Sequence, residues 1–439
     1  MKKIKIIGAG LAGSEAALQL ADAGWKVELF EMRPHKRTPA HQTEYFAELV
    51  CSNSFKSKLI TTAAGLLKKE MEILGCKLLL IAEKCRVPAG NALAIDRKLF
   101  AEKITDLIEN HPHISVRREE VVALDDEPTI VATGPLTSEN LTRNILEIIG
   151  EKHLYFFDAI APIVDAESLD RNIIYEKTRY DKGEADYLNC PFTKEEYYRF
   201  VESLQNAEKH EAHEFETQFF QNIDFRFYEN CTPIEELARR GKDTLRFGVM
   251  RPVGLENPKT QKRPFAVIQL RAENKEKTAY NLVGCQTMLK YGEQKKIFRL
   301  IPGMEKAEFL RFGSIHRNSY LNAPHIFNPD LSLKNKPNIF VAGQLSGVEG
   351  YTESVFSGLL VSLIISQSPK FNPNVLPQST ISGQLYRYLL KENKNFQPVN
   401  ANFGLLPPLP EKIKDKKLKK AKLAERSLEN LKAALNKIN

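Results

Sequence analysis

KIKIIGAGLAGSEAALQLADAGWKVELFE, residues 3–31, is the stretch that decides the fold. The apolar run from Lys3 to Ile7 is typical of a buried strand, and Leu11 to Ala23 has the spacing of a helix. Gly24 suits the end of that helix, and Val27 to Glu31 is a second strand-like run. Strand, helix and strand in this order predict a βαβ unit, and with it an α/β fold.

The loop between the first strand and the helix carries the pattern G-x-G-x-x-G at Gly8, Gly10 and Gly13. The first glycine allows a tight turn, the second lets a pyrophosphate approach the backbone, and the third lets helix and strand pack closely. Glu31 follows 18 residues after Gly13, where a carboxylate can bind the adenosine ribose. The unit is therefore predicted to bind a dinucleotide through Gly8, Ala9, Gly10, Leu11, Ala12, Gly13 and Glu31.

A second glycine-rich segment lies near the other end of the chain, in NIFVAGQLSGVEGYTES, residues 338–354. A strand there ends at Gly343, and a helix starting near Thr352 could aim its N–H groups at a flavin. An enzyme with one nicotinamide site has no need of this second segment, so the pattern favours FAD. The predicted contacts are Gly343, Gln344, Gly350, Tyr351 and Ser354.

The two glycine segments are separated by about 300 of the 439 residues. Thr129 to Ala132 with Gly134 repeats the strand-and-glycine pattern, whereas the sequence from about Tyr155 to Pro324 is mixed and rich in aromatic residues. We therefore predict a Rossmann-like FAD-binding domain that is split by a large inserted α+β domain. The expected limits are 1–154 and 325–410 for the FAD domain, 155–324 for the insertion, and 411–439 for a basic C-terminal helix.

Composition sets the broad class. The 439 residues hold 63 Lys and Arg against 55 Asp and Glu, a net charge of +8 that is compatible with a polyanionic partner. The six cysteines are far apart, with neither a disulfide framework nor a zinc pattern. No apolar run approaches the ~20 residues of a membrane helix. We expect a cytoplasmic protein without a metal and without a membrane partner.

A set of further motifs carries a family resemblance. The chain resembles the folate- and FAD-dependent tRNA (uracil-5-)-methyltransferases, which are GidA-related flavoproteins. The matching runs, which span almost the whole chain in the family's order, are GAGLAGSEAA, FAELVCSNS, LLKKEM, RVPAGNALAIDR, YLNCPFTKEEYYRF, RPVGL, HRNSY, FVAGQLSGVEGYTES and NANFGLLPPLPEKI.

The resemblance implies a methyl transfer in which 5,10-methylenetetrahydrofolate gives a one-carbon unit to reduced FAD, which passes it to uridine C5 in the T loop of tRNA. NADH or NADPH supplies the electrons. It also extends the expected FAD contacts to Val121, Thr133 and Gly134. The expected partners are therefore RNA and folate.

Uracil C5 is a poor nucleophile until a thiolate adds at C6, and a base must later remove the C5 proton. By resemblance, Cys231 is the candidate nucleophile and Cys51 the candidate base or flavin-side partner. An isolated cysteine is more often a small buried hydrophobe. Cys76, Cys85 and Cys285 have apolar neighbours and are expected in the core, while Cys190 is left open.

RNA binding needs cationic groups, and aromatic planes on which an extruded base can stack. The insertion interleaves both kinds of residue, although such a mixture is more often a solvated face: Arg239, Arg240, Lys242, Phe247, Arg251, Phe265, Arg271, His316, Arg317 and Tyr320. The C-terminal run is equally well explained as RNA-steering or as the polar face of a surface helix. Its lysines are Lys412, Lys414, Lys416, Lys417, Lys419, Lys420 and Lys422.

The chain departs from the family pattern at four positions, which are Asn91, Asn230, Val249 and Cys285. These departures leave the RNA substrate open, and the first alternative is the same chemistry on a uridine of large-subunit ribosomal RNA. The glycine motifs alone would also permit a small-molecule flavin oxidoreductase, or a flavin-stabilised RNA-binding protein without catalysis.

Overall fold

The computed structural model describes residues 2–38, 40–150, 154–181, 186–209, 232–368, 371–393 and 396–437. Its main sheet has the strand order β16-β17-β7-β1-β2-β6. All neighbours are parallel except β16, which is antiparallel to β17. The strands are β1 (Lys3–Ile7), β2 (Lys26–Phe30), β6 (Ile114–Arg117), β7 (Thr129–Val131), β16 (Ser332–Leu333) and β17 (Lys336–Val341).

The register of this sheet gathers its loops at one edge. Ile7 pairs with both Phe30 and Val131, and Val131 pairs with Val341. Because these strands are parallel, their carboxyl ends are level with one another. Strand order also reverses at β1, with β2 on one side and β7 on the other, which is where open α/β sheets bind ligands.

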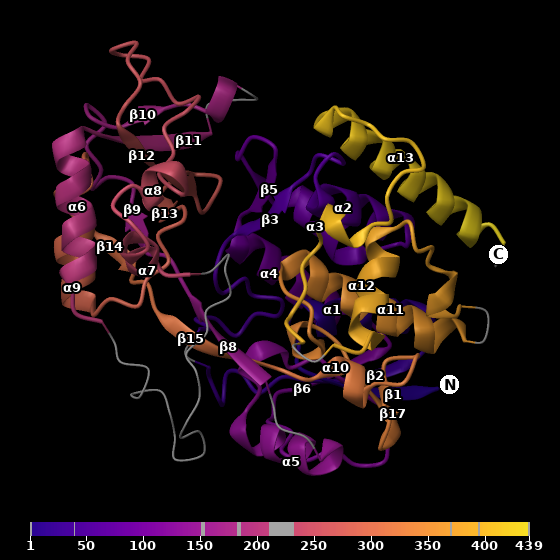
Figure 1. Cartoon of the computed structure of the whole chain (residues 1–439). Helices are drawn as coiled ribbons and strands as arrows, with labels where there is room; N and C mark the ends of the chain where they lie inside the picture. Colours follow the sequence, from indigo (N-terminus) through magenta and orange to yellow (C-terminus); the bar gives the residue numbers. More distant parts are fainter. Residues whose placement is uncertain are drawn as a thin grey trace.

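Helices surround this sheet and come from both ends of the chain (Figure 1). The longer ones are α1 (Leu11–Asp22), α2 (Ala63–Ile73), α3 (Lys77–Lys84), α4 (Arg97–Glu109), α5 (Glu139–Ile149), α11 (Tyr351–Gln367), α12 (Ile381–Leu390) and α13 (Lys416–Leu435). Short turns are α10 (Ala323–Ile326), η1 (Gly134–Leu136), η5 (Gln344–Ser346), η6 (Pro373–Val375) and η7 (Phe403–Leu405). A small sheet of β3 (Ser54–Ser57), β5 (Ala92–Ile95) and β4 (Arg86–Val87) adjoins them.

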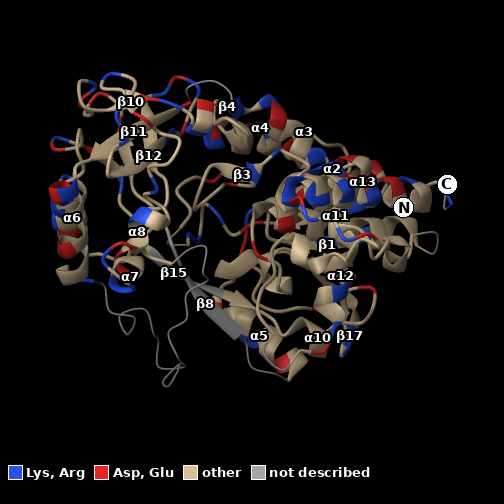
Figure 2. Cartoon of the chain, turned by 45° about the horizontal axis from the view of Figure 1, so that its top comes forward, with Lys and Arg blue, Asp and Glu red and all other residues tan. Residues whose placement is uncertain are grey.

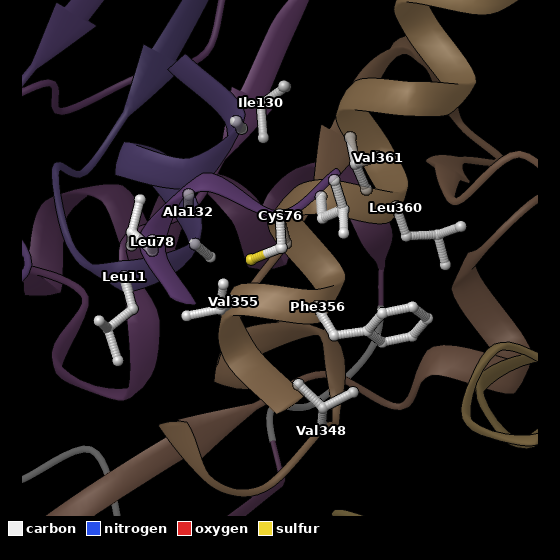
Figure 3. Close-up of a cluster of buried hydrophobic side chains, with 14 of the residues drawn as sticks. Leu11, Cys76, Leu78, Ile130, Ala132, Val348, Val355, Phe356, Leu360 and Val361 are labelled. Atoms are coloured by element: carbon white, nitrogen blue, oxygen red, sulfur yellow. The ribbon is translucent and has the colours of Figure 1, made fainter. Parts of the chain in front are cut away.

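One continuous core joins the two ends of the chain. It includes side chains of β1, α1 and β7 together with those of β17, α11 and α13. Helix α11 is buried on nearly every side from Thr352 to Ile364, as expected of a helix that is apolar all round. Figure 3 shows Val355 of this helix on the side of Leu11 and Ala132, whereas Phe356 and Leu360 point the other way.

The second body has its own core and its own antiparallel sheet, of order β10-β11-β12-β13-β9-β14. Its strands are β9 (Ile163–Asp165), β10 (Tyr175–Glu176), β11 (Tyr187–Phe192), β12 (Ala266–Ala272), β13 (Ala279–Leu282) and β14 (Phe309–Arg311). Its helices are α6 (Lys194–Asn206), α7 (Ile234–Arg239), α8 (Thr244–Phe247), α9 (Tyr291–Phe298) and the short η2 (Arg179–Asp181).

The chain passes between the two bodies through a pair of antiparallel strands, β8 (Leu154–Ala159) and β15 (Ile315–Tyr320) (Figure 1). The prediction of a Rossmann-like domain with a large α+β insertion is confirmed by this architecture. The residue limits expected for each domain stay a prediction. Within the described part of the chain, no helix has the length and apolarity needed to cross a membrane.

The contact between α1 and α11 depends on Gly358. A Cβ atom at this position would lie 2.2 Å from the carbonyl oxygen of Ala12. We therefore expect Gly358→Ala to push the two helices apart and to lower the free energy of unfolding by about 1–3 kcal/mol. Gly292→Ala is the matched control, because a Cβ there meets no atom within 4 Å. Urea denaturation of both variants measures the difference, and equal stability of the two would contradict the packing argument.

Candidate cofactor and thiol site

The turn after β1 forms the floor of the site. Gly8 has a φ of +98°, and a Cβ on it would lie 2.7 Å from the carbonyl oxygen of Ala132 on the neighbouring strand. Gly13 presses α1 against the same turn, because a Cβ there would lie 1.9 Å from the carbonyl oxygen of Gly8. Gly10 differs from both, since a Cβ there would meet nothing within 4 Å. Gly10 therefore faces open space, as a pyrophosphate-binding glycine must.

Two adjoining hollows lie above this turn. The first, of about 580 Å³, is lined by Ile7, Gly8, Gly10, Phe30, Glu31, Met32, Arg33, Thr38, His41, Glu119, Glu120, Val121, Ala132, Thr133, Leu136, Thr137, Ser138 and Leu141. The second, of about 620 Å³, is lined by Gly10, Leu11, Ala12, His41, Glu48, Val50, Ala132, Thr133, Gly134, Pro135, Leu136, Gly343, Gln344, Tyr351 and Ser354. They share Gly10, His41 and Thr133 among others, so together they form one elongated groove.

Glu31 is the buried carboxylate of the first hollow. Its Oε1 accepts hydrogen bonds from the backbone N–H and Nε of Arg33, at 3.1 and 2.9 Å, and its Oε2 accepts one from the N–H of Ala9 at 3.1 Å. Burial alone would raise the pKa of Glu31, but the Arg33 guanidinium and these N–H groups outweigh it and lower the pKa. A carboxylate accepts about four hydrogen bonds, so Glu31 keeps capacity for a ribose hydroxyl.

Two helix N-termini face the second hollow. Helix α1 starts at Leu11 and α11 starts at Tyr351, and neither helix has a side-chain cap on its first N–H groups. Leu11, Ala12, Tyr351 and Ser354 all line this hollow. Unpaired N–H groups at a helix N-terminus favour anionic or electron-rich groups. This donor set fits the pyrophosphate and the flavin pyrimidine edge of FAD.

Most of the predicted cofactor residues come together in this groove. Gly8, Gly10, Leu11, Ala12, Glu31, Val121, Thr133, Gly134, Gly343, Gln344, Tyr351 and Ser354 all line it. The remaining three, Ala9, Gly13 and Gly350, support it from behind. Ala9 donates its N–H to Glu31, Gly13 packs on Gly8, and Gly350 has a φ of +116° directly before α11.

Residues 38 and 40–50 belong to a loop that borders one side of the groove and was not predicted. His41 lies where the two hollows meet, and its Nδ1 is 2.6 Å from the Thr38 hydroxyl. Glu48 of the same loop is bound by the Arg33 guanidinium at 3.2 Å. No periodicity marks such a loop in the sequence. The available signal was the pair of opposite charges at Glu31 and Arg33, which have to be neutralised by each other or by a further charged residue.

Cys51 adjoins the second hollow through Tyr351. Its backbone N–H donates to the Tyr351 hydroxyl at 2.7 Å, and the N–H of Ser52 donates to the same oxygen at 3.1 Å. The thiol-bearing residue is half-buried, in contrast to Cys76, Cys85, Cys190 and Cys285, which are all buried. The core placement of Cys76, Cys85 and Cys285 is thus confirmed, and Cys190 joins them. Cys231 lies outside the described residues.

The second body reaches this point through β12. Arg271 donates from Nε to Oδ1 of Asn53 at 2.7 Å and from a terminal nitrogen to Oγ of Ser52 at 2.9 Å. Asn53 in turn donates to the carbonyl oxygen of Ala272 at 2.9 Å. Next to them, Nε of Arg97 lies 2.7 Å from a carboxylate oxygen of Glu273. Cys51 is therefore held at the junction of the two bodies.

This chain is similar to known proteins over nearly its whole length. The family model described as Glucose inhibited division protein A matches residues 3–370. A protein of Anoxybacillus flavithermus named Methylenetetrahydrofolate--tRNA-(uracil-5-)-methyltransferase TrmFO is 51% identical over 438 residues, covering 99% of this chain and all of the relative. One of Bacillus subtilis with the same name is 51% identical over 430 residues, covering 98% and 97% of the two chains. The chain belongs to the TrmFO family.

A solved structure agrees with the fold. GidA of Aquifex aeolicus superposes with a TM-score of 0.66 at 15% identity, covering 98% of this chain and 73% of that one. At this identity the likeness concerns the fold alone. The family membership confirms the resemblance inferred from the motifs, and FAD, which a TrmFO protein uses, is the cofactor that fits the groove.

The glycines of the turn separate cofactor binding from folding. We expect Gly10→Val to fold normally, because a Cβ there meets no protein atom within 4 Å, but to lose bound flavin because the side chain fills the pyrophosphate position. Gly13→Val is the contrasting variant and should fail to fold, because its side chain would displace the Gly8 carbonyl. Flavin absorbance and thermal melting of the purified variants test this. A yellow Gly10→Val protein would contradict the placement of the pyrophosphate.

His41 gives the site a pH dependence. Burial, together with the nearby Arg33 guanidinium, lowers the pKa of His41 from 6.5 to about 4. Between these values the unfolded chain takes up a proton that the folded chain does not, so stability falls as pH falls from 6.5 towards 4, by about 1.4 kcal/mol per pH unit at most. His41→Asn should flatten urea-denaturation midpoints over this range. His35→Asn, at an exposed histidine, should leave the slope unchanged.

Proposed function

We propose that the protein is a folate- and FAD-dependent methyltransferase that forms 5-methyluridine in the T loop of tRNA. The observation that carries the proposal is the position of Cys51, whose backbone N–H is bound to the hydroxyl of Tyr351 at the flavin end of the groove. A thiol beside a flavin, in a chain about half identical to tRNA-(uracil-5-)-methyltransferases over their full length, supports this chemistry.

The reaction sets three tasks for the chain's own residues. A thiolate must add to uracil C6 so that C5 becomes nucleophilic, a base must take the C5 proton, and the bases of the loop must be held out of their stack. When bound, FAD supplies the one-carbon and redox chemistry that links 5,10-methylenetetrahydrofolate and NAD(P)H to the uracil. The residues of the groove bind and orient that cofactor.

The division of labour between two cysteines rests on the family resemblance. In this proposal Cys231 adds to C6, and Cys51 takes the C5 proton or acts on the flavin side. What supports the role of Cys51 is its backbone: the hydrogen bonds to Tyr351 and the neighbouring Arg271 bonds to Ser52 and Asn53 fix its position. Cys51 is therefore held in place from both bodies before any substrate arrives.

The Tyr351 hydroxyl has a specific part in this arrangement. Burial, followed by the proximity of Cys51, raises the pKa of Tyr351 well above its ordinary value, so the phenol stays protonated at physiological pH. Its oxygen accepts two backbone N–H groups at the Cys51 and Ser52 positions. The hydroxyl therefore positions the loop that carries Cys51.

The RNA candidates divide into exposed and buried groups. Phe247 is 73% exposed, and Arg239, Arg240 and Arg251 are also exposed, so they are suited to a phosphate or a base. Arg271 and Tyr320 are buried, at 8% and 2% exposure, and cannot meet RNA directly. The side chains of His316 and Arg317 are outside the described part.

The C-terminal helix α13 presents a separate cationic face, seen as the blue segments around its label in Figure 2. All seven lysines of the C-terminal run are exposed, and five of them lie on α13, whose Leu423, Ala424, Ser427 and Leu431 face the core. In this proposal they attract the RNA phosphates through counterion release. The cytoplasm, where unfinished tRNA is found, is the proposed compartment.

The cysteine roles can be tested one at a time. We expect Cys51→Ala and Cys231→Ala to abolish methyl transfer while both proteins stay yellow, because Cys51 is not a lining residue of the groove and the proposed role of Cys231 is towards uracil. Cys85→Ala is the matched control: it is a buried cysteine outside the groove lining and should keep transfer with a small loss of stability. Full activity of Cys231→Ala would remove it as the nucleophile.

The substrate is tested with labelled methylenetetrahydrofolate, NADH and separate unmodified tRNA and ribosomal RNA transcripts. We expect label in the tRNA T loop, and a T-loop uridine-to-cytidine transcript should take up none. Label in ribosomal RNA alone would overturn the choice of tRNA. Label in neither RNA would overturn the proposed function.

A further inference from the structure

A third cavity, apart from the flavin groove, lies where the two bodies face each other. It is open to solvent and has a volume of about 750 Å³. Its lining residues are Ser57, Ala89, Gly90, Asn91, Ala92, Thr178, Arg179, Tyr180, Tyr187 and Gln269. The first five come from the small sheet and its loop beside the FAD-binding body, and the others from the β10–β12 region. No residue of the flavin groove takes part. We call it the Tyr180 pocket.

The planar groups of this pocket are held in place before a ligand arrives. Tyr180 has a φ of +61°, and its backbone N–H donates to the carbonyl oxygen of Gly254 at 2.9 Å. Its ring lies over Gly254, where a Cβ would come within 2.6 Å of the ring, yet 52% of the residue stays exposed. The Arg179 guanidinium donates to the carbonyl oxygens of Val253 and Arg251, at 2.5 and 3.0 Å.

The polar groups of the pocket match a nucleobase in kind. Asn91 is exposed at the rim of the pocket. Gln269 also lines the pocket, and its amide nitrogen lies 3.0 Å from Oδ1 of Asn189. Amide groups can donate and accept at the edge of a base. Among the described residues that line the pocket, Arg179 is the charged one, and the nearby Asp186 carboxylate accepts a hydrogen bond from the N–H of Gly90 at 2.6 Å. The pocket therefore suits the planar, polar base of a nucleotide.

Strand pairing and hydrogen bonds connect this pocket to the residues that follow Cys51. Tyr187, which donates to the carbonyl oxygen of Ala89 at 3.4 Å, is paired with Arg271 across β11 and β12. Arg271 then binds Ser52 and Asn53. Gln269 precedes Arg271 by two residues on the same face of the strand, a distance of about 6.5 Å. The pocket residue Gln269 is thus two positions along β12 from Arg271, which binds the residues next to Cys51.

We propose that the Tyr180 pocket binds an unpaired nucleotide of the substrate RNA, a neighbour of the reacting uridine. The base stacks on Tyr180 and Arg179, and Asn91 and Gln269 bind its edge. This deepens the proposed function and rests on it, because it needs a single-stranded loop whose bases are splayed apart. Folate and NAD(P)H must reach the flavin, whereas this pocket shares no lining residue with the flavin groove.

Asn91 gives this proposal a feature particular to the chain. It stands where the family pattern has a second glycine, and its side chain adds a donor and an acceptor to the rim. Because its exposed position needs no rearrangement of the core, Asn91→Gly removes the amide without disturbing the fold. We expect this change to relax the choice of base at the bound position.

The test measures steady-state kinetics with a T-loop stem-loop RNA. Tyr180→Asn removes the ring and keeps a residue that tolerates positive φ. We expect its KM for the RNA to rise about tenfold, in line with the loss of one stacked base, with kcat unchanged within about twofold. Tyr180→Phe should restore the wild-type KM. NAD(P)H-dependent flavin reduction without RNA, and the KM for folate, should not change.

An abasic RNA makes the assignment sharper. Abasic residues are placed singly at the loop positions next to the target uridine. At the bound position, the abasic RNA should raise the KM of the wild-type protein about tenfold. It should not raise the KM of Tyr180→Asn any further, because that variant has already lost the same contact. If the effects of the abasic residue and of Tyr180→Asn multiply at every loop position, the proposal is wrong. An unchanged KM for the RNA or a raised KM for NAD(P)H in Tyr180→Asn would also overturn it. Wild-type protein that fails to methylate the RNA would instead overturn the proposed function, and this proposal with it.

Discussion

The close contact between α1 and α11 is the constraint on which the site depends. Gly358 brings its helix so near to α1 that a single added carbon would reach the Ala12 carbonyl. Gly343 is similarly close, since a Cβ there would lie 3.2 Å from the Ala12 side chain. Residues more than 300 positions apart thereby form one groove with two helix N-termini in it. A cofactor with both a pyrophosphate and an electron-rich pyrimidine edge matches that pair of helix ends.

A buried polar junction then fixes the second body on the first. Arg271 donates a hydrogen bond to Asn53, and Arg97 forms an ion pair with Glu273, in a largely buried region. Burying such groups costs free energy unless each finds its partner, so an imperfect approach of the two bodies is penalised more than an apolar contact would be. The junction is therefore better suited to specifying one arrangement than to adding stability. This junction also fixes the position of Cys51, because the residues next to Cys51 are part of the junction.

The sequence predicted what glycine spacing and strand order control. Gly8, Gly10 and Gly13 imply a turn of known geometry, and parallel strands must bring their carboxyl ends together, so the edge of the sheet followed from local pattern. The loop around His41 did not follow, because its shape depends on Arg33 bonding two carboxylates, which no periodicity reveals. Arg271 was one of the RNA candidates, yet it is buried, since charge in a sequence does not tell which side of a strand a residue occupies.

The connection between the bodies limits how the enzyme can work. The chain crosses twice, through β8 and β15, and a two-stranded ribbon alone would permit bending. Opening the bodies would, however, separate Arg97 from Glu273 and Arg271 from Asn53, and would leave buried charges without partners. Because that motion is costly, we expect the two bodies to keep their arrangement when the RNA enters, and not to close around it. The bases of the loop must then move, which agrees with pockets that are already shaped before the substrate binds.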